Sequence, residues 1–164
     1  MQRIRVRTRS QSGFSLIELL IVIAIILIIV GIAVPKFNSA RMNANETAVI
    51  NEIKSIHAAQ AQYLSQFQRF ATTLAELGPP ASGGPGPQAA DLLPSVLVSG
   101  EKDGYTFTMT ATPQGYNVTA IPRTYNTTGR RTFFSDQTMS IHQNWSNEPA
   151  NASSPELGRE AGKS

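Results

Sequence analysis

The feature that most constrains this chain is an unbroken apolar block from Phe14 to Val34, in which only Ser15 and Glu18 are polar. A helix over these 21 residues is about 32 Å long, close to the hydrocarbon thickness of a bilayer. The block is rich in isoleucine and valine, which favour strands in water, but lipid leaves the backbone no hydrogen-bond partner except its own helix. We therefore expect a membrane-spanning helix and exclude a cytosolic globular protein.

The basic excess of the chain lies ahead of this block. Four of the 14 lysines and arginines stand among the first nine residues, without an acidic neighbour: Arg3, Arg5, Arg7 and Arg9. The remaining chain carries 10 basic and 11 acidic side chains, so the net charge of +3 gives no reason to expect a nucleic-acid partner. By the positive-inside rule, we expect residues 1–12 to stay in the cytoplasm and everything after Pro35 to be exported.

Glu18 is a carboxylate inside the apolar block, where an acidic side chain costs about 2.5–3.5 kcal/mol on insertion scales. Such a group needs a cation, and the block contains none. Cleavage after Gly13 would create one, because it frees the α-amino group of Phe14, which is largely protonated at neutral pH. The amine of the same chain and that of a neighbouring chain are both geometrically possible partners.

Two simpler interpretations of the block are a secretory signal peptide and a plain signal anchor. Gly31 and Ala33 have the spacing of a signal-peptidase site, but the apolar run is longer than the usual stretch of about 7–15 residues and contains a carboxylate. A plain signal anchor explains the span and leaves Glu18 unexplained. Both interpretations are disfavoured.

The sequence from Ser12 to Ile25, Ser-Gly-Phe-Ser-Leu-Ile-Glu-Leu-Leu-Ile-Val-Ile-Ala-Ile, resembles the N-terminal signature of the type IV pilin and type II secretion pseudopilin superfamily. This resemblance implies that a prepilin peptidase cuts between Gly13 and Phe14, removes residues 1–13 as a leader and methylates the new amine of Phe14. It also implies that Glu18 orders subunits during assembly. The expected partners are copies of the chain, other pilin-like subunits, an inner-membrane assembly platform and the lipid bilayer.

The end of the apolar block contains two poor helix formers, Gly31 and Pro35. We expect residues 14–35 to form the membrane-spanning and assembly helix, with its weak point in this stretch. A kink where the span leaves the membrane is one interpretation. The resemblance suggests another, in which the stretch loses helical order on assembly.

Beyond Pro35 the apolar residues take on an amphipathic spacing. They predict a helix over about residues 36–68 with one core-facing side that carries Val49, Ile53, Ile56, Tyr63 and Phe67. Glu46 falls on the expected polar side. His57 is expected to be an interface or edge histidine and not a metal ligand.

A short helix capped by Thr72 or Thr73 is expected to end at Leu77. The segment 78–88 follows as a loop, because eight of its eleven residues are glycine or proline. It lacks the lysine and the preceding strand of a phosphate-binding loop.

We expect the exported head to span residues 36–146. In its part beyond the loop, apolar and polar residues alternate with a period of two. We expect strands at about 104–112, 116–121, 132–135 and 139–142, the first pair joined by a turn at 113–115. A four-stranded antiparallel sheet packed on the amphipathic helix gives an α+β, pilin-like fold. Residues 147–164 are polar and poor in apolar side chains, so we expect a disordered tail.

No catalytic motif is present, and the chain is not expected to be an enzyme or to bind a cofactor or metal. The leading hypothesis is a structural filament subunit of a type IV pilus, and the alternative within the superfamily is a pseudopilin of type II secretion. Two weaker alternatives concern binding. The first is calcium at Glu101, Asp103 and Asp136. The second, a DNA-uptake role, uses a larger set of residues: Arg123, Arg130, Arg131, Tyr125 and Phe133.

Overall fold

The computed structural model describes residues 13–112 and 114–158, and the chain divides into two compact units, Met1–Phe37 and Asn38–Ser164. The arginines of the expected leader lie outside the described residues. One helix, α1 (Leu16–Phe67), contributes to both units. By length and composition it can cross a membrane, and none of its most apolar 18-residue stretch is buried.

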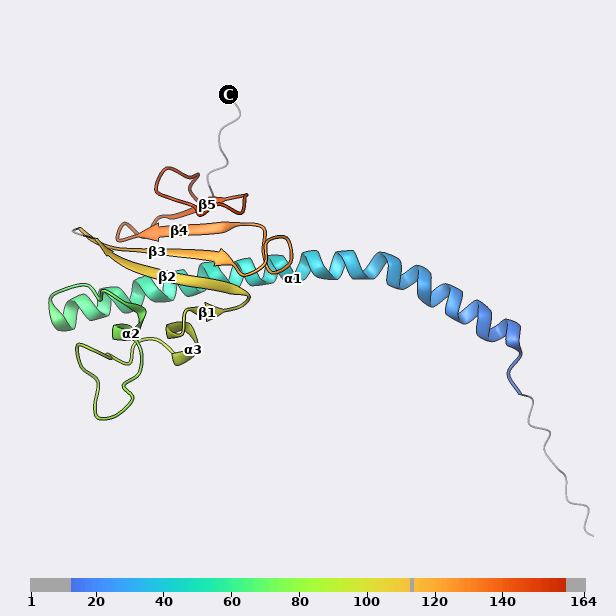
Figure 1. The fold of residues 1–164 in the computed structure, drawn as a ribbon, viewed down its shortest axis with the longest axis horizontal. Coiled ribbons are helices and arrows are strands. Elements are labelled where there is room, and N and C mark those ends of the chain that lie inside the picture. Colours follow the sequence, from blue (N-terminus) through green and yellow to red (C-terminus); the bar gives the residue numbers. More distant parts are fainter. Residues whose placement is uncertain (1–12, 113, 159–164) are drawn as a thin grey trace, which may run out of the picture. The chain divides into compact units, whose positions relative to one another are not determined.

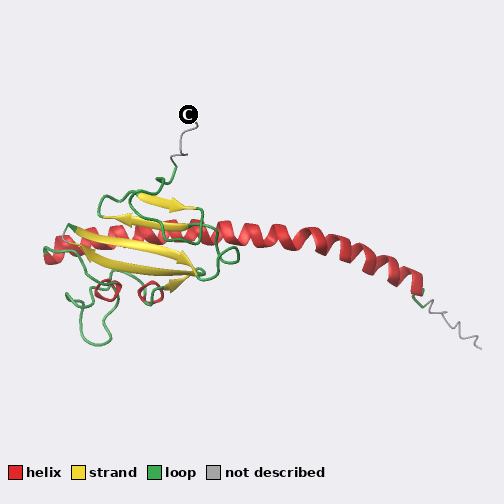
Figure 2. Cartoon of the chain, turned by 45° about the horizontal axis from the view of Figure 1, so that its top comes forward, coloured by secondary structure: helices red, strands yellow, loops and turns green. Residues whose placement is uncertain are grey.

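The second unit is a five-stranded antiparallel sheet that packs against the second half of α1, as Figures 1 and 2 show. The strands follow one another in the sheet in chain order: β1 (Glu101–Lys102), β2 (Tyr105–Thr112), β3 (Gly115–Pro122), β4 (Thr132–Asp136) and β5 (Ile141–Asn144). Two short helices, α2 (Leu74–Leu77) and α3 (Ser95–Val98), precede the sheet. The predicted α+β class is confirmed.

Alternation along the strands creates the core. Tyr116, Val118 and Ala120 of β3 are buried, and Tyr105 and Phe107 of β2 lie on the same face because Tyr105 is paired with Pro122 and Phe107 with Ala120. This face packs on the apolar side of α1, whose residues Val49, Ile53, Ile56 and Tyr63 are fully buried. The helical spacing and the strand alternation thus meet in one core.

The sheet differs from the expected one at both edges. The prediction of four strands was wrong, because a two-residue edge strand, β1, is too short to show alternation in sequence. The last strand starts at Ile141 and not at 139, since Asp136 to Met139 forms a turn in which Thr138 N and Oγ1 both donate to Asp136 Oδ1. The expected turn at 113–115 lies partly outside the described residues.

The segment 147–158 is ordered against the sheet, which corrects the expectation of a disordered tail for these residues. Leu157 N donates to Ile141 O at 2.6 Å, and Gln143 N donates to Pro155 O at 2.9 Å. Thr132 Oγ1 donates to Glu148 O and accepts from Ala150 N. Backbone hydrogen bonds to the edge strand β5 hold this segment. Composition indicates only how much apolar surface a segment can bury, so it did not reveal this order. Residues 159–164 lie outside the described part.

His57, which we had expected at an interface or an edge, lies in the core of the second unit between α1 and the sheet and is 4% exposed. Burial is tolerated because both ring nitrogens have hydrogen-bond partners, Tyr116 and Ser135.

Candidate processing and assembly segment

The described segment ahead of α1 is exposed and belongs to no helix or strand. Gly13, Phe14 and Ser15 precede the helix, and the Phe14 side chain is 88% exposed. A Cβ added at Gly13 would meet no atom within 4 Å, so packing within the described chain does not require glycine there. The Gly13–Phe14 peptide bond is therefore accessible to another protein. While that bond is intact, the Phe14 nitrogen is an uncharged amide.

Glu18 caps the start of α1. Leu19 N donates to Ser15 O at 3.3 Å, which makes Ser15 the N-cap residue of the helix. The Glu18 carboxylate reaches back and accepts a hydrogen bond from Ser15 N, with 2.9 Å between Ser15 N and Glu18 Oε2. This is half of a capping box, which satisfies a free N–H of the first turn and places negative charge at the positive end of the helix dipole.

Sequence reasoning did not find this cap, although the Ser-x-x-Glu spacing of Ser15 and Glu18 before an apolar run was the available signal. The cap holds the carboxylate beside the backbone nitrogen that follows Phe14. The arrangement keeps Glu18 within the first turn of the helix, on the side where cleavage would release an amine.

The apolar half of α1 has no cover from the other residues that the structure describes. Large side chains are exposed on all sides of the helix, and Leu16, Leu27 and Ile28 are among the most exposed. The second half of the same helix is different, because Val49, Ile53 and Ile56 have no exposed surface. An apolar surface of this extent indicates contact with lipid or with other protein chains.

Gly31 and Pro35, the expected weak point, both lie within α1, and the helix is continuous through them. A Cβ at Gly31 would meet no atom within 4 Å, so no packing contact in the described chain requires glycine at this position either. A change in helical order at this stretch during assembly stays a prediction.

Arg131, a residue of the DNA-uptake alternative, is committed to an ion pair inside the head. Its Nε donates to Glu46 Oε2 at 2.8 Å, and its Nη1 donates to Gln143 Oε1 at 2.8 Å. Arg130 N donates to the other oxygen of Glu46 at 2.7 Å. Glu46, which we had placed on the polar side of the helix, is 2% exposed because these groups replace its water.

The remaining residues of that alternative are also engaged. Phe133 is buried in the core, and Arg123 pairs with Glu101 at 3.1 Å. The Arg131 guanidinium lies over the rings of Phe133 and Trp145, at 5.3 and 5.0 Å from their centroids. The arrangement does not favour a DNA-binding surface.

The three acidic residues of the calcium alternative are not assembled into a ligand set. Glu101 pairs with Arg123, and Asp136 accepts from Thr138. Among the residues that the structure describes, no group of three or more histidines, cysteines or acidic residues is placed to hold a metal ion.

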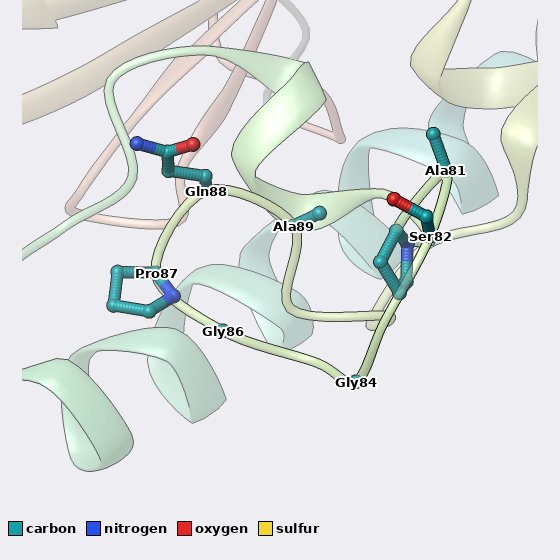
Figure 3. A pocket seen from close by; sticks show the side chains of 8 residues that line it. Ala81, Ser82, Gly84, Gly86, Pro87, Gln88 and Ala89 are labelled. Carbon is teal, nitrogen blue, oxygen red and sulfur yellow. The ribbon is translucent and has the colours of Figure 1, made fainter.

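The glycine- and proline-rich loop at 78–88 curves around a solvent-open pocket of about 480 Å³, shown in Figure 3. It is lined by uncharged residues: Pro80, Ala81, Ser82, Gly84, Gly86, Pro87, Gln88 and Ala89. The loop closes on itself through reciprocal backbone hydrogen bonds between Gly86 and Ala89, and Tyr63 Oη donates to Pro87 O at 2.5 Å. The pocket offers no catalytic or charged group.

The loop is also anchored through Glu76 of α2, the short helix that precedes it. This carboxylate accepts hydrogen bonds from Arg69 and Thr72. Tyr63 Oη, which gives its one hydrogen to Pro87 O, lies 3.1 Å from Glu76 Oε2. Burial alone would raise the pKa of Glu76, but these donors outweigh burial and lower it. Thr73 precedes α2 as expected, yet its side chain makes no capping hydrogen bond, because Thr72 provides the contact with Glu76.

Comparison with known proteins agrees with the geometry of the N-terminal segment. Residues 8–34 match the family model of the prokaryotic N-terminal methylation motif. The chain carries this methylation motif. Gly13, Phe14, Glu18 and Gly31 lie within the matched span, and Pro35 follows it directly.

The chain is similar to two type IV pilus proteins. It is 35% identical over 66 residues to the type IV major pilin protein PilA of Myxococcus xanthus. The matched stretch covers 40% of this chain and 30% of the relative. It is 44% identical over 55 residues to the type IV wide pilus major component PilA4 of Thermus thermophilus. This second matched stretch covers 34% of this chain and 42% of the relative. The matches thus span less than half of either relative. No solved structure matches the chain.

Proposed function

We propose that this chain is a structural subunit of a type IV pilus-like filament, which is processed at its N-terminus and polymerises through the first half of α1. The observation that carries the proposal is the methylation motif on a helix whose apolar half is fully exposed and whose other half is packed into an α+β head. The similarity to two pilus proteins supports it. The role is structural, and the chain itself performs no reaction.

Processing is the first step of this function. A prepilin peptidase cuts the exposed bond between Gly13 and Phe14 and methylates the Phe14 nitrogen. The open surroundings of Gly13 support access to this bond. The chain is then a single-pass inner-membrane protein, with its basic N-terminal residues on the cytoplasmic side before they are removed.

Assembly follows when the new amine gives Glu18 a cationic partner. The carboxylate is already held at the first turn of α1 by Ser15 N, so the released amine of its own chain or of a neighbour can join it there. Helix contacts with neighbours replace lipid contacts, and packing together with this charge pair must favour the filament. Partners in this step are copies of the chain, other pilin-like subunits and the inner-membrane assembly platform.

Electron microscopy of sheared cell surfaces tests this function. We expect long external fibres that bind an antibody against the head, residues 38–158. Fibres that form normally without this chain, or labelling confined to the periplasm, would contradict a pilus subunit. The second outcome would instead support the secretion pseudopilin.

A further inference from the structure

His57 belongs to a closed hydrogen-bond chain between α1 and the sheet. Its Nδ1 lies 2.6 Å from Tyr116 Oη on β3, and its Nε2 lies 2.8 Å from Ser135 Oγ on β4. Ser135 Oγ donates in turn to Ser140 O at 2.6 Å. Tyr116, Ser135 and His57 are all buried. One histidine thus joins the helix to two strands.

The donors and acceptors of this chain determine the protonation of the imidazole. A hydroxyl has one hydrogen, and Ser135 gives its hydrogen to the carbonyl of Ser140, so Ser135 must accept from His57 Nε2–H. Tyr116 then donates its hydroxyl hydrogen to Nδ1. The network assigns a neutral imidazole with its hydrogen on Nε2.

A second proton on His57 has no place in this network. Protonated Nδ1 would point a hydrogen at the hydroxyl of Tyr116, which already points its own hydrogen at Nδ1. If the hydroxyl turned to accept from Nδ1, its own hydrogen would need another acceptor. Among the described residues, the Tyr116 hydroxyl has no other side-chain hydrogen-bond partner. Protonation therefore leaves a buried donor without an acceptor, which is costly.

The charged and titratable groups facing His57 do not reverse this effect. Burial lowers the pKa of His57 from its ordinary value of 6.5, and Asp136 at the end of β4 opposes burial with a smaller effect. Asp136 Oδ1 is itself occupied by Thr138. Burial, followed by Asp136, raises the pKa of Tyr116 on β3 to about 12, so this phenol stays neutral.

We propose that His57 is a buried acid-sensitive switch, whose protonation breaks the hydrogen bond between Tyr116 and Nδ1 and loosens α1 from β3. The switch belongs to the head and does not depend on the filament function. The folded head binds this proton less readily than the unfolded chain. Stability is therefore fully present above pH 6.5 and is lost as the pH falls toward the lowered pKa.

The test is denaturant unfolding of the full chain in detergent micelles, followed by near-UV circular dichroism between about pH 7.5 and pH 5. Below the unfolded pKa, each pH unit is expected to raise the unfolding equilibrium constant by up to about tenfold. His57→Gln is expected to remove this dependence. An unfolding constant that does not change with pH in the wild type, or a dependence that survives in His57→Gln, would overturn the proposal.

His142 provides the matched control. Its side chain is only partly buried, and its Nδ1 lies 2.7 Å from Ser154 O, a carbonyl that can only accept. A charged imidazole keeps this hydrogen bond, so His142→Gln is expected to preserve the pH dependence. Loss of the pH dependence in His142→Gln would assign that dependence to His142 and contradict the switch at His57.

A second measurement covers the case in which His57→Gln does not fold. Nitrogen-15 NMR of the wild-type imidazoles is expected to show His57 with its hydrogen on Nε2 at neutral pH and with a pKa lowered from the ordinary histidine value of 6.5. A hydrogen on Nδ1 of His57, or a His57 pKa at or above 6.5, would overturn the proposal.

Discussion

At the scale of single residues, Glu18 has two separable roles. It caps α1 by accepting from Ser15 N, and it is the proposed partner of the Phe14 amine. A cap needs a side-chain acceptor, whereas an ion pair needs a negative charge. The two roles can therefore be separated by a substitution that keeps the acceptor and removes the charge.

Glu18→Gln makes this separation, since glutamine also serves at this position of a capping box. We expect the variant to insert and to be processed, but to yield filaments at less than about a tenth of the wild-type level, as a loss of at least 1.4 kcal/mol per contact implies. Filament yield in sheared fractions is the measurement. Glu18→Asp, which keeps the charge on a shorter side chain, is the control. Normal filaments from Glu18→Gln would leave Glu18 with the capping role alone.

The ion pair between Glu46 and Arg131 holds α1 to the segment before β4. Removing one partner leaves an uncompensated buried charge, so Glu46→Ala is expected to lower the free energy of unfolding of the head by about 3 kcal/mol. Glu101→Ala breaks the exposed pair with Arg123 and is the matched control, with an expected change within about 1 kcal/mol. Chemical denaturation measures both. Equal losses in the two variants would contradict the assignment of Glu46 to the interior.

Polarity in the sequence could not reveal these buried groups. Glu46, His57 and Gln60 all lie on α1 and are satisfied by partners that are distant in sequence: Glu46 by Arg131, His57 by Tyr116 and Ser135, and Gln60 by both backbone groups of Ala71. A polar residue at helical spacing indicates a solvated side unless its partner is known. The methylation motif that contains Phe14 and Glu18 was accessible from sequence because both residues lie in one short segment.

At the scale of elements, α1 carries two surfaces with different requirements. One side of its second half is buried by the sheet, and its first half has no cover from residues 13–112 and 114–158. Gly31 and Pro35 lie in the uncovered half and near its end. Helical order there depends on local propensity, because no tertiary contact in the described chain supports Gly31.

Gly31→Ala tests whether this stretch must lose helical order. The added methyl group meets no atom within 4 Å, and alanine stabilises a helix interior by about 1 kcal/mol relative to glycine. We expect slower hydrogen exchange around residue 31 in the membrane-bound subunit and a lower filament yield. A normal yield together with the slower exchange would contradict the loss of order on assembly.

The elements found from sequence are those with a long repeating pattern. The spacing of α1 and the alternation of β2 and β3 follow from burial of one side, which is a property of the sequence itself. The two-residue β1 and the ordered segment 147–158 have no such pattern, since backbone hydrogen bonds hold them. Such elements become visible only when the strands they pair with are in place.

At the scale of the whole molecule, the chain combines a self-sufficient head with a segment that requires other molecules. The head has its own core and satisfied buried polar groups, whereas the apolar half of α1 is exposed. This division is what a filament subunit needs, because the exposed half can exchange lipid for neighbouring chains while the head stays folded. The proposed processing at Gly13 and Phe14 is the event that would prepare the exposed half.

Mass spectrometry of the N-terminal peptide of the protein recovered from cells tests this account most directly. The account predicts a chain that starts at Phe14 and carries one added methyl group on its α-nitrogen. A chain that still starts at Met1, or one that starts after Ala33, would contradict it.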